Sequence, residues 1–201
     1  MVLGGNLMKR KLIAVLLLIA VIPVSLMATP FLQIGPLVSY NRTVVELEED
    51  DFWALNNFSF GADVRINPIK YLSIDIPATI GFGDDFAVSI AAIPTINGNI
   101  PIGNILDISL GLGTQFDFQY TGRTNDSWTM NGLPMENAGD AFQHSKLVYR
   151  AGVTVNLAAI SIGINALVPG QAGFGDNDIG GVFNPMWEST RFSVVALFNL
   201  F

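Results

Sequence analysis

The chain contains no cysteine, which excludes disulfides, thiol chemistry and a lipid-modified cysteine. Charge is also scarce: 13% of the 201 residues are charged, against about a quarter in an ordinary soluble domain, while 50% are hydrophobic. The net charge of −7 argues against nucleic acid as a partner. The length is sufficient for one domain with its own core, and the polar character must come from Gly, Ser, Thr, Asn and Gln.

Long hydrophobic runs are lacking everywhere except near the N-terminus. There the basic stretch Lys9–Lys11 precedes the apolar run Leu12–Ile22, and a cleavage site follows Ala28. This order is typical of a secretory signal peptide. The alternative is an N-terminal membrane anchor, for which the run is short because a spanning helix needs about 20 apolar residues. We expect residues 1–28 to be a cleaved signal peptide and residues 29–201 to form the mature domain.

The mature chain alternates apolar and polar residues with a period of two, which is the pattern of a β-strand with one apolar face. In "FSFGADVRINPIKYLSIDIPATIGFG", the charges Asp63, Arg65 and Asp75 all fall on the polar face of a predicted hairpin. The same alternation recurs along the chain. The expected strands are near Leu32–Asn41, Phe58–Asn67, Tyr71–Phe82, Phe86–Ala92, Leu106–Tyr120, Lys146–Leu157, Ile160–Ala166 and Glu188–Phe201.

The connections between these strands alternate in length. The turns after the second, fourth and sixth strands are short, namely "NPIK", "NGNIPIGN" and "AA". The other connections are Thr43–Leu55, "GDD", Thr121–Gln143 and Pro169–Met186, of which three are long. Short turns on one rim and long loops on the other are typical of an outer-membrane barrel. The predicted fold class is all-β, an eight-stranded antiparallel up-and-down transmembrane β-barrel.

Alternation alone leaves open which side the apolar face points to, because a soluble lipocalin-type barrel turns it inward. A soluble exterior carries many charges, but the mature chain has only two lysines, Lys70 and Lys146. We therefore expect the apolar face to contact lipid and the polar face to line the lumen. The predicted lumen charge network is Asp63, Arg65, Asp75, Asp107, Asp117, Lys146 and Arg150. Paired charges that plug the pore are favoured, with a polar conduit or proton path as the alternative.

Aromatic residues gather near the ends of the predicted strands, as in the girdles that outer-membrane barrels carry at both membrane interfaces. Most fall toward the long loops, and Tyr71 falls beside a short turn. The predicted girdle is Tyr40, Phe58, Phe60, Tyr71, Phe82, Phe86, Phe116, Phe118, Tyr120 and Tyr149.

The hairpin "FGADVRINPIKYLSIDIPATIGFG" resembles those of small outer-membrane barrels of the OmpW, OmpA-transmembrane and OmpX type. Such hairpins have a strand ending in Asn-Pro, a short turn, an aromatic residue and a second strand ending in Gly. Phe198 and the terminal Phe201 resemble the C-terminal signal by which the barrel-assembly machinery recognises these proteins. Asn199 departs from this pattern, because family members carry an apolar residue there. The better apolar register of the last strand is Phe192, Val194, Ala196, Phe198 and Leu200.

Three prolines, Pro36, Pro77 and Pro94, fall inside predicted strands of a barrel that has no free edge. Each removes one donor from the hydrogen-bond ladder. At Pro77 we expect either a β-bulge or a lumen water that satisfies the unpaired carbonyl.

Acidic residues cluster in the predicted loops. They are Glu46, Glu48, Glu49, Asp50, Asp51, Asp84, Asp85, Asp176 and Asp178. Oxygen-rich clusters can bind Ca²⁺, but the spacing matches no complete calcium loop. We expect a solvated acidic rim and no metal site or cofactor.

The residues give little support for catalysis. Barrel lipases and acyltransferases need a histidine with a serine, and His144 is the only histidine. Its neighbour Ser145 points to the other side of a strand, and nothing marks Ser127 or Ser189 as a nucleophile. We expect no enzymatic activity and no catalytic residues.

Two functions remain after these exclusions, both in the outer membrane of a diderm bacterium with loops exposed at the cell surface. The first expectation, which the OmpW resemblance implies, is passive passage of small hydrophobic molecules. The alternative, which the OmpA and OmpX resemblance implies, is a plugged barrel with a structural or surface-adhesion role and no transport. The expected partners are outer-membrane lipid, the barrel-assembly machinery, and a small hydrophobic solute or a host surface ligand. A closed salt-bridge network in the lumen favours the plugged barrel, and an apolar lumen with a lateral opening favours passage.

Overall fold

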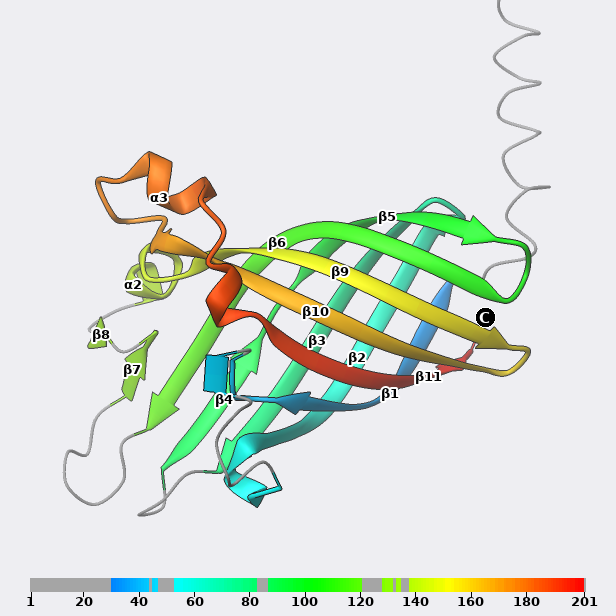
Figure 1. Cartoon of the computed structure of the whole chain (residues 1–201), viewed down its shortest axis with the longest axis horizontal. Helices are drawn as coiled ribbons and strands as arrows, with labels where there is room; N and C mark the ends of the chain where they lie inside the picture. Colours follow the sequence, from blue (N-terminus) through cyan, green and yellow to red (C-terminus); the bar gives the residue numbers. More distant parts are fainter. Residues whose placement is uncertain are drawn as a thin grey trace, which may run out of the picture.

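The structure, a computed structural model, describes residues 30–43, 45–46, 53–82, 87–120, 128–131, 133–134 and 138–200. Its described part forms a closed ring of antiparallel strands, in which β1 pairs with β2 on one side and with β11 on the other (Figure 1). If β4 and β5 are counted as one interrupted strand, the ring has eight strands, and the predicted all-β, eight-stranded antiparallel barrel is confirmed. In ring order they are β1 (Leu32–Tyr40), β2 (Phe58–Ile69), β3 (Leu72–Phe82), β4 (Val88–Ala92) with β5 (Thr95–Ile102), β6 (Leu106–Tyr120), β9 (Lys146–Leu157), β10 (Ile160–Gly173) and β11 (Arg191–Asn199).

The strand interruption lies at Pro94, between β4 and β5. Both pieces pair with β3 on one side and β6 on the other, and the register is the same before and after the break. Proline lacks the N–H that a strand donates, so it interrupts the ladder without shifting it. The bulge expected at Pro77 is wrong, because Asp63 pairs opposite Pro77 in an unbroken register. The Pro77 carbonyl accepts a hydrogen bond from the Ile93 N–H at 3.0 Å.

The strands extend further than the alternation predicts. Most of "NGNIPIGN" belongs to β5, and the actual turn covers Gly103–Ile105, with Gly103 at φ 65°. Likewise β2 continues to Ile69, and β10 continues past Pro169 to Gly173. The predicted turns were misplaced because Asn, Gly and Pro signal turns in sequence, whereas here Asn97 and Asn99 occupy lumen-facing strand positions.

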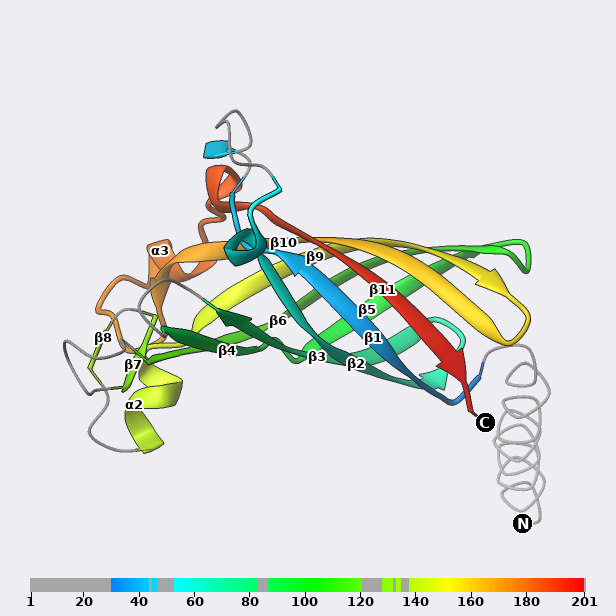
Figure 2. The ribbon, with the colours of Figure 1, turned by 90° about the horizontal axis from the view of Figure 1, so that it is seen from below.

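The long connections carry short elements at one end of the barrel, called here the loop end, and the tight turns mark the turn end (Figure 1). The loop-end elements are η2 (Leu55–Asn57), β7 (Trp128–Met130), β8 (Leu133–Pro134), α2 (Ala138–Gln143), α3 (Ile179–Phe183) and η4 (Trp187–Ser189). No helix in the described residues is both long and apolar enough to cross a membrane. Figure 2 shows the same elongated ring from below.

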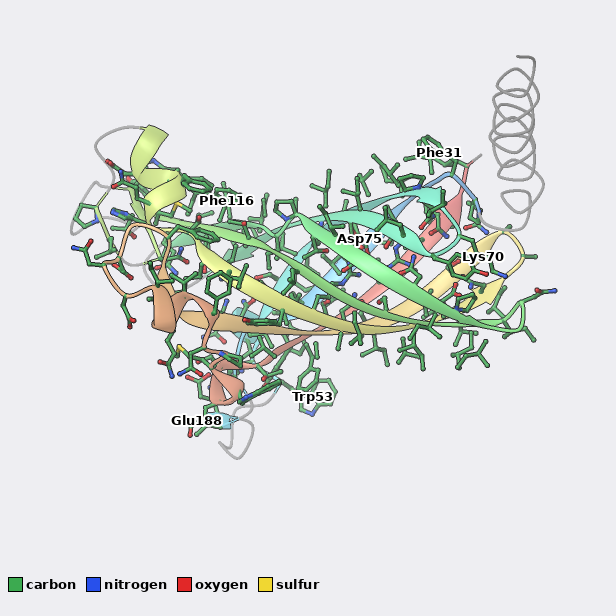
Figure 3. All side chains as sticks on the ribbon, turned by 90° about the horizontal axis from the view of Figure 1, so that it is seen from above. Phe31, Trp53, Lys70, Asp75, Phe116 and Glu188 are labelled. Carbon is green, nitrogen blue, oxygen red and sulfur yellow. The ribbon has the colours of Figure 1, made fainter. Side chains whose placement is uncertain are left out.

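The two faces of the strands differ sharply in character. Apolar residues point outward, and Ile96, Leu110 and Ile164 are each about 60% exposed. Polar residues point into the lumen, where Asp63 and Asp75 are at most 1% exposed. Figure 3 places Asp75 inside the barrel between the two ends. The outward orientation of the apolar face is therefore as the sequence predicts.

The last strand follows the register predicted from its apolar residues. Phe192, Val194 and Phe198 are exposed on the outside, whereas Val195 and Leu197 are buried in the lumen. With Leu37 of β1, these two form a small apolar cluster inside a largely polar interior. Phe201, the second residue of the predicted insertion signal, lies outside the described residues.

Candidate functional site

The centre of the lumen is occupied by one carboxylate held between two guanidinium groups. Arg65 Nε donates to both carboxylate oxygens of Asp75, at 3.1 and 3.0 Å, and its Nη2 lies 2.9 Å from Oδ2. Arg150 Nη1 also donates to Asp75 Oδ2. We call Arg65, Asp75 and Arg150 the waist triad, and the level of the lumen at which they meet the waist. Its three side chains are almost fully buried, so water screens their attraction weakly.

The strands that carry the waist triad lie far apart around the ring. Asp75 is on β3 and Arg150 on β9, and these strands are separated by β5 and β6 on the shorter path. Arg65, on β2, also approaches Thr154 of β9 with its Nη1, 3.4 Å from the hydroxyl oxygen. The waist contacts therefore run across the lumen rather than along its wall.

Neutral side chains accept further hydrogen bonds from the waist triad. Arg150 Nη1 donates to the Thr95 hydroxyl at 3.2 Å, and Nη2 donates to Asn165 Oδ1 at 2.9 Å. Asn165 in turn approaches Ser193 Oγ of β11 with its Nδ2, at 3.4 Å. The network thus joins β2, β3, β5, β9, β10 and β11 at one level of the barrel.

Asp63 is a second buried carboxylate near the waist. It lies two residues before Arg65 on β2 and therefore on the same face of the strand. Neither of its carboxylate oxygens has a hydrogen-bond partner among the described residues, although the side chain is fully buried. The two acids and two arginines at the waist balance in formal charge. Asp63 makes no direct ion pair within the described part of the chain, so it interacts with the two guanidinium groups only through space.

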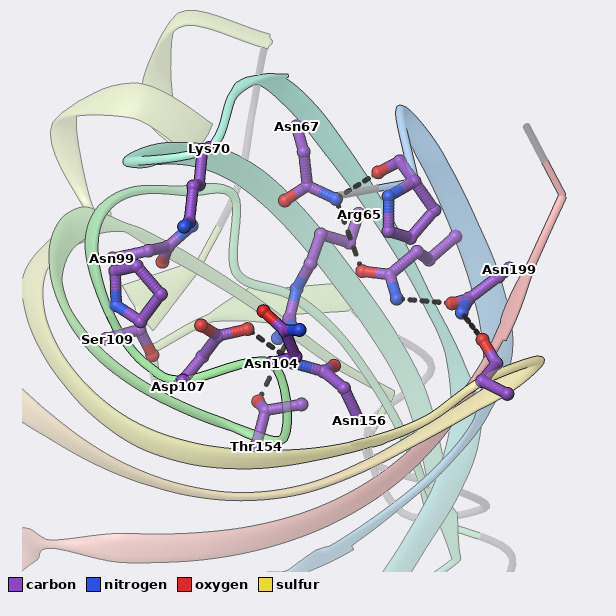
Figure 4. A pocket seen from close by; sticks show the side chains of 15 residues that line it. Arg65, Asn67, Lys70, Asn99, Asn104, Asp107, Ser109, Thr154, Asn156 and Asn199 are labelled. Carbon is purple, nitrogen blue, oxygen red and sulfur yellow. Dashed lines mark hydrogen bonds between the residues drawn. The ribbon is translucent and has the colours of Figure 1, made fainter. Parts of the chain in front are cut away.

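A polar cavity of about 180 Å³ opens below the waist at the turn end (Figure 4). Amide side chains are the most numerous in its lining, which also contains the charged side chains Arg65, Lys70 and Asp107. The lining amides are Gln33, Asn67, Asn99, Asn104, Asn156 and Asn199. An amide both donates and accepts, so such a wall holds water and small polar groups of either sign.

The amides at the turn end bind one another in a continuous chain. Gln33 Nε2 donates to Asn199 Oδ1 at 2.7 Å and to Ser161 Oγ at 3.1 Å. Ser161 donates to Asn156 Oδ1 at 2.7 Å, and Asn156 Nδ2 donates to Asp107 Oδ2 at 2.6 Å. Asn199, the residue that departs from the family pattern, therefore faces inward and helps to close this end.

Two adjoining cavities lie above the waist at the loop end, with volumes of about 310 and 150 Å³. They share Gln115, Asp117, Gln119, Pro169 and Arg191 in their linings. Arg191 Nη1 lies 3.8 Å from Asp117 Oδ2. Lys146 lines the larger cavity and makes no ion pair within the described part of the chain.

The seven predicted lumen charges do not form one network. Only Arg65, Asp75 and Arg150 are joined directly, and Asp117 pairs instead with Arg191. Asp63, Asp107 and Lys146 have no ion pair in the described residues, so the structure brings only part of the predicted set together through ion pairs. The charges are spread along the barrel axis, and strand alternation predicts a shared face but not a shared height.

Sequence reasoning missed several lumen residues that complete the site. Arg191 follows directly from the favoured register of the last strand, because it alternates inward with Ser193 and Val195. The neutral partners Thr95, Thr154 and Asn165 carry no charge and gave no signal beyond their place on the polar face. Thr95 also lies beyond Ala92, the last residue of the predicted fourth strand, and so was not assigned to a strand face.

The predicted aromatic residues that the structure describes lie on the outward face. Phe60, Tyr71 and Phe82 are strongly exposed, and Lys70 Nζ lies 5.8 Å from the centre of the Tyr71 ring at the turn end. Tyr40 is buried against Phe58, with ring centres 5.2 Å apart. Phe116, Phe118, Tyr120 and Tyr149 are half-buried. Phe86 lies outside the described residues.

The acidic loop residues that the structure describes bind their own backbone. Glu46 accepts from the Thr43 N–H at 2.7 Å and from its hydroxyl at 3.0 Å, and these bonds lower the pKa of Glu46. Asp176 accepts from the Gly173 N–H at 2.7 Å, and Asp178 accepts from the Gly181 N–H at the start of α3. The other predicted acids, Glu48, Glu49, Asp50, Asp51, Asp84 and Asp85, lie outside the described residues, as does the predicted signal peptide 1–28.

The only histidine has no serine partner in the described residues. Ser145 Oγ donates to the Phe142 carbonyl at 2.6 Å, and His144 Nδ1 is buried without a hydrogen bond. No group of three or more carboxylate or histidine side chains suited to a metal ion occurs among the residues described. What this lumen can do chemically is hold water and small polar molecules at each end while ion pairs fill its centre.

Comparisons with known proteins add little to this geometry. No family model matches the chain, and no curated protein matches it. Among solved structures, neisserial surface protein A (NspA) is similar, with a TM-score of 0.44 and 9% sequence identity. The match covers 84% of this chain and 96% of that one. At this degree of likeness, the functional assignment depends on the residues of the chain itself.

Proposed function

We propose that the chain is an integral outer-membrane β-barrel of a diderm bacterium, closed at its waist, with a structural or surface-interaction role. In this proposal the loop end faces the cell surface. The observation that carries it is the contact of Asp75 with both Arg65 and Arg150 across the lumen. An eight-stranded barrel is only just wide enough to be filled by side chains, so side chains that meet across its lumen leave little room beside them.

The placement in a membrane is supported by the exterior of the ring. The outward residues of every ring strand are predominantly apolar, and many are more than a third exposed. Water would solvate such a surface poorly, whereas lipid suits it. A closed barrel also leaves no edge strand with unpaired backbone groups in the hydrocarbon. The predicted signal peptide 1–28 supports export across the inner membrane.

Passive passage of small hydrophobic molecules remains a prediction with weaker support. The cavities at both ends are lined mainly by polar side chains. The apolar residues that cluster in the lumen, Leu37, Val195 and Leu197, are buried against one another. A hydrophobic solute would therefore lose its favourable environment at the waist, where two arginines and two acids lie.

Expression of the whole chain in a diderm host tests the placement. We expect the protein in the outer-membrane fraction, with residues 1–28 absent by mass spectrometry of the intact protein. Unboiled samples should migrate differently from boiled ones on a gel, because a closed barrel resists detergent. A soluble periplasmic product would contradict the proposal.

Liposome swelling tests the closure separately. Liposomes that contain the folded barrel should swell in an isotonic arabinose solution no faster than empty liposomes. Liposomes that contain a large general porin provide the positive control. Swelling above the empty control would favour passage through the lumen.

A further inference from the structure

The two cavities at the loop end adjoin and form one compartment. With the lumen closed at the waist, as proposed above, this compartment has no exit toward the turn end. We call it the loop-end cup and define it by the residues that line both cavities, namely Gln115, Asp117, Gln119, Pro169 and Arg191, together with Lys146. The larger cavity, of about 310 Å³, lies next to a smaller one of about 150 Å³. This space suits a molecule of the size of a monosaccharide, which enters and leaves by the same side.

The charges of the loop-end cup leave one positive group in excess. Among the described residues that line it, two are cations, Lys146 and Arg191, and one is a carboxylate, Asp117. Glu46, outside the lining, also feels the charge of Arg191. The Arg191–Asp117 distance of 3.8 Å is long for an ion pair, and the Arg191 side chain is 39% exposed, so its guanidinium can turn toward a ligand. Lys146 has no ion-pair partner among the described residues, although the side chain is half-buried.

The neutral lining of the cup suits hydroxyl groups. Hydroxyl and amide side chains line the smaller cavity, and they are Ser39, Asn41, Ser59, Thr79, Ser89, Gln115 and Gln119. The Ser59 hydroxyl donates to Asn41 Oδ1 at 2.7 Å, and the Nδ2 donor of Asn41 can therefore face a ligand. Ala91, Ile93 and Leu167 give the same cavity an apolar patch that can pack against the carbon atoms of a sugar ring.

We propose that the loop-end cup binds a small monocarboxylate that also carries hydroxyl groups, of the class of the uronic acids. Its carboxylate lies between Lys146 and Arg191, and its hydroxyls reach the amides and hydroxyls of the smaller cavity. The single excess positive charge favours a monoanion, because Asp117 repels the second charge of a phosphate monoester. This site goes beyond the proposed function, since it concerns what the surface end of the barrel recognises.

Isothermal titration of the purified, folded barrel in detergent micelles tests the site. The probes are sodium glucuronate, glucose and glucose 6-phosphate. We expect saturable binding of glucuronate. The affinity for glucose should be about tenfold lower, because glucose lacks the carboxylate. Added salt should weaken the binding of glucuronate because the Arg191 side chain is partly exposed to solvent. Equal binding of glucose and glucuronate, tighter binding of glucose 6-phosphate, or no saturable binding of glucuronate would overturn the proposal.

Variants locate the binding within the barrel. Lys146→Gln and Arg191→Gln should each weaken glucuronate binding about tenfold. Asp117→Asn removes the competing acceptor of Arg191 and should strengthen it. Lys70→Gln is the matched control, because Lys70 lines the cavity at the opposite end. Heat-modifiable migration verifies that each variant is folded. If Lys70→Gln weakens binding as much as Lys146→Gln, or if Asp117→Asn abolishes it, the cup is not the site.

Discussion

Arg150 on β9 reaches across the lumen to the carboxylate of Asp75 on β3, which Arg65 already holds from the adjacent strand β2. One acid therefore joins two bases from opposite parts of the wall. All three side chains are nearly inaccessible to water. This arrangement accounts for charges in the middle of an apolar hairpin, because they face the lumen.

Removal of the shared carboxylate should be costly. Asp75→Ala leaves two buried guanidinium groups without their partner, and we expect the free energy of unfolding to fall by about 3–5 kcal/mol. Asp107→Ala is the matched control, because Asp107 is half-buried and its described hydrogen bond is to Asn156. It should cost about 1 kcal/mol. Urea titrations followed by tryptophan fluorescence measure both, and equal losses would argue that the waist triad contributes nothing special.

Close approach of neighbouring strands makes one lumen glycine hard to replace. A Cβ at Gly61 would meet the Ala78 carbonyl oxygen and would lie 2.7 Å from Thr79 Cα, both backbone atoms. A Cβ at Gly98 would meet nothing closer than 3.8 Å. We expect Gly61→Ala to destabilise the barrel by about 1–3 kcal/mol and Gly98→Ala to be tolerated. Similar midpoints of thermal unfolding for the two variants would show that the strands part easily at Gly61.

Spin labels test which face of each strand meets lipid, and the absence of cysteine makes single-site labelling simple. Val194 points outward on β11, and Gln119 lines the loop-end cup. In lipid vesicles, a label at Val194→Cys should be broadened by oxygen, which is soluble in lipid. A label at Gln119→Cys should be broadened by a water-soluble nickel chelate. The reverse result would mean that the apolar face is turned inward.

A charge on the apolar exterior should be costly only where lipid surrounds it. Ile164→Arg places a guanidinium on the exposed outer face of β10, and we expect a loss of about 2–4 kcal/mol in bilayers. Phe183→Arg, in α3 at the loop end, changes an equally exposed residue and should cost much less. The comparison uses urea unfolding in liposomes. Equal losses at the two positions would place both in the same environment.

Much of the fold is predictable from alternation, because a period of two assigns each residue to the lumen or the exterior. The positions of Asp63, Arg65, Asp75 and Arg150 on one face follow from this rule alone. The rule also selects the correct register for the last strand, although at Asn199 it conflicts with the pattern of the small outer-membrane barrels that the sequence resembles.

Alternation does not predict which charged side chains pair across the lumen. Whether Arg150 meets Asp75 or Asp107 depends on how far each strand is shifted along the barrel, and one strand's pattern does not contain that shift. The length of the fourth strand was also underestimated. Its alternation ends at Ala92, yet the ladder with β3 continues beyond Pro94 in the same register.

The central claim is that the waist triad closes the lumen, and conductance in planar bilayers tests it most directly. Insertion is verified beforehand by heat-modifiable migration and by the oxygen broadening of the Val194→Cys label in the same preparation. The account predicts that the purified wild-type protein, inserted and folded, gives no stable single-channel current steps. Stable, reproducible steps from the wild-type barrel would contradict it and would favour a conducting lumen.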